Sequence, residues 1–123
     1  MARLLNPGLG DYLDRWTILD LKIQHAITLG RPTQHFVAEQ REITRIVGPD
    51  GLADTHLQEL HQLNKGVWEL GDILQQAAKV WPKIAEDAAY MIAEAAVTQY
   101  KLNEERARVV YTLNGFDLPE KVR

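Results

Sequence analysis

Glycine and proline divide this chain into four uninterrupted stretches, and that division constrains the fold more than any other feature. The two residues gather at 7–10, 30–32, 48–51, 82 and 115–119. Between these positions apolar residues recur every three or four residues, as they do along one face of an α-helix, and β-branched clusters are few. We therefore predict four helices, at about 9–29, 33–47, 55–80 and 82–114.

Each predicted helix carries one apolar face. In the first helix this face consists of Tyr12, Trp16, Leu19, Ile23 and Ala26; in the second, of Phe36, Ile43 and Val47. In the third it consists of Leu57, Leu60, Leu63, Val67, Leu70 and Leu74; in the fourth, of Ile84, Ala88, Met91, Ala95, Thr98, Leu102, Val109 and Leu113. Four such faces are buried by packing against one another, so the pattern predicts an all-α four-helix bundle.

Local signals place the helix ends. Thr33 is a candidate N-cap of the second helix, and the third begins after Asp54 or Thr55. Pro82 suits the first turn of the fourth helix, and Asn114 with Gly115 ends it.

The length and composition predict one domain, spanning residues 1–123 and ending in a short C-terminal tail. A chain of 123 residues with 46% hydrophobic content has the size for one core. A fourth helix of some thirty residues is about 45 Å long, whereas the short second helix covers only about 22 Å. The uncovered apolar surface predicts a homo-oligomer, either a dimer or a tetramer.

Several classes of protein are disfavoured by composition. The apolar runs are short and no charged leader precedes a long one, so we expect neither a membrane span nor a secretory signal. The chain has no cysteine, which fits a reducing compartment, and we expect a cytoplasmic protein. With 14 basic and 17 acidic residues, it lacks the basic surface of a nucleic-acid binder.

Charged residues interrupt two of the apolar faces. Glu39 lies in the face of the second helix, and Glu42 follows it three residues later. Arg106 lies in the face of the fourth helix, with Asn103 at its border. A charge on an apolar face needs a partner, so an inward Arg106 implies an inward anion. One interpretation is an ion pair between Glu39 and Arg106 that fixes the register of two helices.

Further polar residues are candidates for sites. Glu69 and Asp72 are three residues apart on the third helix and could hold one divalent cation, or they could lie on a solvated face. Asp14, Arg15 and Asp20 are expected to bridge the first helix to its neighbours. The four histidines, His25, His35, His56 and His61, have no metal-ligand spacing and are expected at the surface or at helix caps. The three tryptophans, Trp16, Trp68 and Trp81, are expected to anchor the core or an interface, and one of them could line a nucleotide pocket.

Taken in order, Glu39-x-x-Glu42, Glu69-Leu-Gly-Asp72-Ile-Leu and Asn103-x-x-Arg106 resemble the motif series of the MazG-type all-alpha nucleoside triphosphate pyrophosphohydrolases. The resemblance implies that Glu39, Glu42, Glu69 and Asp72 hold Mg²⁺ or Mn²⁺, with Glu39 and Glu42 catalytic. A metal-activated water would cleave a (d)NTP to the monophosphate and pyrophosphate. Asn103 and Arg106 would contact phosphate. Ala38 departs from the family pattern, where a glutamate is usual.

A second resemblance covers more of the chain and implies no activity. The segments Gly10–Lys22, Asn64–Glu69 and Asn103–Arg106 are similar to an uncharacterised family of short helical bacterial proteins. In that pattern Asp14 and Asp20, rather than Glu39 and Glu42, would complete the site with Glu69 and Asp72. The alternative to an enzyme is a non-catalytic helical interaction or assembly module, in which inward charges fix the helix register.

Overall fold

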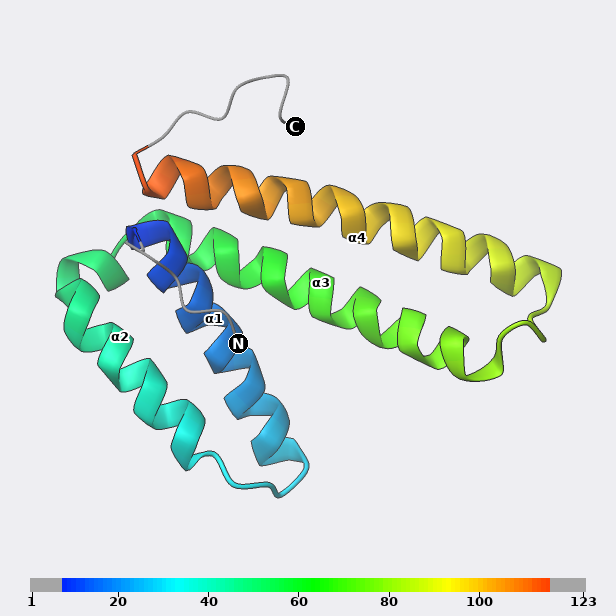
Figure 1. The fold of residues 1–123 in the computed structure, drawn as a ribbon, viewed down its shortest axis with the longest axis horizontal. Helices are drawn as coiled ribbons and strands as arrows, with labels where there is room; N and C mark the ends of the chain where they lie inside the picture. Colours follow the sequence, from blue (N-terminus) through cyan, green and yellow to red (C-terminus); the bar gives the residue numbers. More distant parts are fainter. Residues whose placement is uncertain (1–7, 116–123) are drawn as a thin grey trace.

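The computed structural model describes residues 8–115, and within that range the chain is all-α (Figure 1). Its four helices are α1 (Leu9–Thr28), α2 (Gln34–Leu52), α3 (Thr55–Val80) and α4 (Glu86–Leu113). The predicted four-helix bundle is therefore confirmed. No helix in this range is long and apolar enough to cross a membrane. The C-terminal tail expected after Gly115 lies outside the described residues.

The helix ends agree with the sequence signals at some positions and depart from them at others. Asp54 caps α3, since its carboxylate accepts a hydrogen bond from the His56 backbone N–H, and this bond lowers the pKa of Asp54. Thr33 precedes α2 without a side-chain capping bond. The predicted end of the second helix at about residue 47 coincides with a break in α2: Gly48 has a non-helical backbone, with φ of 71°, and a further turn beyond it continues to Leu52.

The predicted start of the fourth helix at Pro82 is wrong. Residues around it form a turn, in which the Lys83 N–H donates to the Val80 carbonyl and the Ile84 N–H to that of Pro82. Because these bonds close a turn instead of opening a helix, α4 begins only at Glu86.

The four helices form two hairpins that meet at one end of the longer hairpin (Figure 1). Helices α3 and α4 pack along each other, and α1 packs against both of them and against α2. Helix α2 packs chiefly on α1. Helix α1 is therefore the central element, and it buries residues on several sides, whereas the sequence pattern indicated a single face. These buried residues are Gly10, Leu13, Thr17, Leu19, Leu21 and Ala26.

The core lies where α1 meets the α3–α4 hairpin. Leu13, Leu60 and Val109 form its buried centre, one from each helix. Burying a leucine side chain contributes about 1.5–3 kcal/mol. Gly10 allows the close approach, since a Cβ there would lie 2.3 Å from the Val110 carbonyl oxygen. The Asn114 side chain accepts a hydrogen bond from the Gly10 N–H, which ties the start of α1 to the end of α4.

Beyond α1, the far halves of α3 and α4 cover only each other (Figure 1). We call this part, residues 70–101, the distal hairpin. Its only buried hydrophobic residue is Ala95. Large apolar side chains are exposed along it, including Met91, which the sequence pattern had placed on the inner face. These side chains are Ile73, Val80, Trp81, Tyr90, Met91, Val97 and Tyr100.

Candidate functional sites

A closed polar cluster joins α1, α3 and α4 at the core. The Arg106 guanidinium donates two hydrogen bonds to the Asp14 carboxylate, from Nε to Oδ1 at 2.8 Å and from Nη2 to Oδ2 at 2.6 Å. Asn64 Nδ2 donates to Asp14 Oδ1 at 2.9 Å and to Thr17 Oγ1 at 2.7 Å. The Asp14 side chain is 14% exposed and Arg106 30%. The hydrogen bond from Arg106 to Asp14 raises the pKa of Arg106.

The inward Arg106 therefore has the inward anion that its position predicted, but the partner is Asp14. The suggested pair of Glu39 with Arg106 is wrong, because α2 packs chiefly on α1 and not on α4. Glu39 instead accepts two hydrogen bonds from Arg15, at 2.6 and 3.0 Å. These bonds lower the pKa of Glu39 and raise that of Arg15.

Asp20 connects three helices, as expected for the charged residues of α1. Its carboxylate contacts His61 Nε2 at 3.1 Å and accepts a hydrogen bond from Gln40 at 3.4 Å. His61 is half-buried between α1 and α3, so its expected place at the surface or at a cap is wrong. A lone histidine between a leucine and a glutamine gives no sequence signal for this contact.

The four carboxylates predicted to hold metal lie apart on two helices. Glu42 is exposed and paired with Arg45 on the same helix. Glu69 and Asp72 are exposed on α3, and neither forms an ion pair with another described residue. Asn103 is exposed on α4, whereas Arg106, one turn further along, is half-buried. Within residues 8–115, no three His, Asp or Glu side chains come together as a metal site.

The fold brings together several residues of the second sequence pattern, but it does not join Asp14 and Asp20 with Glu69 and Asp72 in one site. Asp14 and Thr17 from its first segment contact Asn64 from the second. Arg106 from the third segment contacts the same Asp14. Because the two opposite charges of this cluster are paired with each other, the arrangement holds three helices in register.

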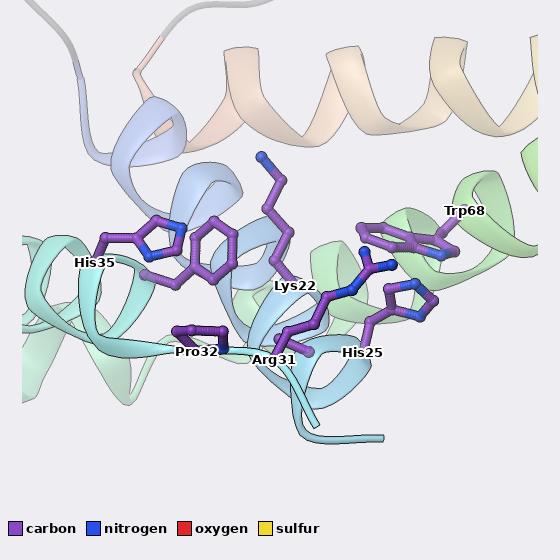
Figure 2. A pocket seen from close by; sticks show the side chains of 8 residues that line it. Lys22, His25, Arg31, Pro32, His35 and Trp68 are labelled. Atoms are coloured by element: carbon purple, nitrogen blue, oxygen red, sulfur yellow. The ribbon is translucent and has the colours of Figure 1, made fainter. Parts of the chain in front are cut away.

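A half-open pocket lies where the end of α1 meets the start of α2 and the middle of α3 (Figure 2). Its volume is about 390 Å³. The lining residues are Lys22, His25, Ala26, Arg31, Pro32, His35, Phe36 and Trp68, and none of them is acidic. In Figure 2 His35 lies on one side of the pocket, and Trp68 with His25 lies on the other. Sequence reasoning missed Lys22 and Arg31 as site residues, because an isolated basic residue at a helix end or loop is common.

The outward face of α4 forms a second unfilled surface. Counted in heptads from Tyr90, the positions that face a partner in a coiled coil are occupied by Tyr90, Ala93, Val97, Tyr100, Glu104, Ala107 and Tyr111. Among them, Tyr90 is 72% exposed, Val97 55% and Tyr100 65%. Glu104 is the only charged member. We call these seven residues the outer stripe.

Charged residues flank one edge of the outer stripe in an ordered way. At intervals of seven residues, this edge carries Asp87, Glu94, Lys101 and Arg108. The last three follow Tyr90, Val97 and Glu104 by four residues. The two residues toward the start of α4 are acidic, and the two toward its end are basic. The other edge is uncharged, with Ala89, Ala96, Asn103 and Val110. These heptads are present in the sequence, but the prediction for this helix rested on its inner apolar face.

Comparisons of the chain with protein-family models, with curated proteins and with solved structures find no match. Both family resemblances therefore stay predictions, and function has to be argued from the residues of the described structure.

Proposed function

We propose that this protein is a helical assembly module, in which two copies pair through the outer stripes of their α4 helices in antiparallel orientation. The observation that carries the proposal is an exposed apolar stripe with a 3–4 spacing, opposite the face of α4 that packs on α3. A helix that is apolar on two opposite faces leaves one of them in water unless a partner covers it.

The flanking charges favour a second copy as the partner and set its direction. In an antiparallel pair, Glu94 lies across from Lys101 of the second copy, and Asp87 lies across from Arg108, which is also paired with Glu105 of its own chain. All four contacts of the two-fold pair then join opposite charges. In a parallel pair this charged edge would lie across from the uncharged edge of the second copy, so none of these charges would meet an opposite charge.

Side-chain sizes also fit the antiparallel arrangement. When the flanking charges are opposed, Tyr90 faces Ala107 of the second copy, and Val97 faces Tyr100. Large side chains are thus set against small ones, so the layers can interdigitate. The pairing would cover the outward face of α4 in the distal hairpin, where the chain buries least by itself.

Sedimentation equilibrium of the full chain tests this proposal. We expect a dimer for the natural sequence and a dissociation constant raised about tenfold or more by Val97→Glu, which sets a charge in the stripe. The matched control is Val80→Glu: Val80 is 54% exposed and Val97 55%, but Val80 lies at the end of α3, outside the stripe. A monomeric natural protein, or equal weakening by both variants, would contradict the proposal.

The second candidate function is the pyrophosphohydrolase activity implied by the sequence motifs. It is supported by Glu69 and Asp72, which lie exposed one turn apart on α3 and form no ion pair with a described residue. Two such carboxylates are suited to Mg²⁺ or Mn²⁺. The other proposed ligands, Glu39 and Glu42, are each engaged by an arginine.

Pyrophosphate release over a panel of (d)NTPs, with Mg²⁺ and with Mn²⁺, tests this second candidate. Hydrolysis that is lost in Asp72→Asn and kept in the control Asp87→Asn would support it. No release from any of the nucleotides with either metal would rule it out.

A further inference from the structure

We infer that the pocket between α1, α2 and α3 binds a small aromatic anion, meaning a molecule with a flat ring and a carboxylate or phosphate group. This site is independent of the α4 stripe, since none of its lining residues lies on α4. Its volume of about 390 Å³ is in the range of small-molecule pockets, about 300–1,000 Å³.

The charges around the pocket favour an anion. Lys22 and Arg31 are cationic at neutral pH, and His25 and His35 add imidazole nitrogens that can donate hydrogen bonds. Within the described residues, neither Lys22 nor Arg31 forms an ion pair. The carboxylate that lies close enough to interact electrostatically with Lys22 is Glu39, and Glu39 is already bound by Arg15. Both cations are therefore available to a ligand.

The aromatic side chains favour a flat ring. The rings of Trp68 and His25 are in edge contact, with centroids 5.5 Å apart and planes at 61°. Phe36 also lines the pocket, with the Lys22 ammonium 5.8 Å from its ring centre. A planar ligand between Phe36 and Trp68 would pack on two rings. Its anionic group would then be within reach of Lys22 and Arg31, whose side chains lie between His35 and Trp68 in Figure 2.

The ring and the anion are both needed for this recognition. An anion without a ring would contact only the two solvated cations, Lys22 and Arg31. A neutral ring would pack on the aromatic side chains but leave both cations unpaired. Two sources supply the combined chemistry, namely aromatic carboxylates and aromatic phosphates. Indole-3-acetate and adenosine monophosphate represent them, with indole, adenosine and inorganic phosphate as the matched incomplete probes.

Titration of the full-length protein followed by NMR tests the inference through the Trp68 indole N–H signal. We expect at least one of the two aromatic anions to shift this signal saturably. It should bind about tenfold or more tightly than its neutral counterpart and than phosphate. The anion that binds more tightly identifies the source. If the neutral probes bind as well as the anions, or if neither anion shifts the signal at about 10 mM, the inference is wrong.

Substitutions in the pocket provide the second arm. Arg31→Gln and Lys22→Gln should each weaken binding of the aromatic anion about tenfold, whereas Lys79→Gln on the distal hairpin should leave it unchanged. Arg31 is exposed, so its loss spares the core, and sedimentation of Arg31→Gln should show unchanged association. Equal binding by Arg31→Gln and the natural protein would overturn the assignment, whatever the result for α4 pairing.

Discussion

The two halves of the α3–α4 hairpin differ in how far their apolar and charged side chains are covered within one chain. In the half that α1 covers, Leu60 and Val109 are buried and the charge of Arg106 is met by Asp14. In the distal half, Val97 and Tyr100 face outward and Ala95 is the only buried hydrophobic residue. The first half is complete within one chain, whereas the second has the apolar pattern of an interface. Charged residues fix the geometry in one half, and we propose that in the other they select the partner.

The largest effect is expected from breaking the complete half at Asp14. Asp14→Ala leaves Arg106 without its anion and Asn64 without one acceptor, so we expect the free energy of unfolding to fall by about 2–4 kcal/mol. The effect is moderated because Arg106 keeps 30% of its side chain exposed. Urea unfolding in the Val97→Glu background excludes any contribution from association. Asp72→Ala, on an exposed site, should cost no more than about 0.5 kcal/mol; an equal cost for both variants would contradict the role of the cluster.

The incomplete half can be improved at Glu104, the charged member of the outer stripe. Glu104→Leu removes a charge from a position that would face the second copy, so we expect the dissociation constant of the dimer to fall about tenfold. Sedimentation equilibrium measures the change. Glu69→Leu adds the same apolar surface on α3, outside the stripe, and should not change the dissociation constant. A lower dissociation constant for Glu69→Leu would indicate nonspecific hydrophobic association and not pairing through the stripe.

The smallest effect is expected at the contact between α1 and α2, where Arg15 binds Glu39. The pKa of Glu39 is lowered in the folded state, so its contribution is present above its unfolded pKa of about 4.3 and is lost as the pH falls through the folded pKa. Because the pair is partly exposed, Glu39→Gln should cost less than about 1 kcal/mol at pH 7. Unfolding curves from pH 7 to pH 3 should show the two proteins converging in acid. Glu69→Gln, which breaks no ion pair, should match the natural protein throughout; a Glu39→Gln difference that grows in acid would refute this role.

Much of the fold followed from the sequence because helix periodicity and turn residues act locally. Asp54 marked the start of α3, and the four helices lie close to their predicted ranges. The central position of α1 did not follow, since residues such as Thr17 and Asn64 are buried only because they hydrogen-bond to each other. Polar residues whose partner is nearly fifty positions away carry no local signal.

The candidate sites were harder to predict for the same reason. The position of Arg106 indicated an inward anion, but only the packing of α1 between α2 and the longer hairpin identifies that anion as Asp14 instead of Glu39. Lys22, Arg31 and Trp68 meet only after three helices have packed. The heptads of α4 were present in the sequence, but the sequence did not show that the opposite face of α4 packs on α3 and leaves them exposed.

The central claim is that two α4 helices pair in antiparallel orientation, and a charge-swap cycle measured by sedimentation equilibrium tests it most directly. Lys101→Glu and Glu94→Lys should each weaken the dimer, since each sets like charges opposite one another. The double variant Glu94→Lys with Lys101→Glu should restore it, because antiparallel pairing then opposes a lysine at position 94 to a glutamate at position 101. If the double variant dimerises no better than the single ones, or if no variant differs from the natural chain, antiparallel pairing through α4 is contradicted.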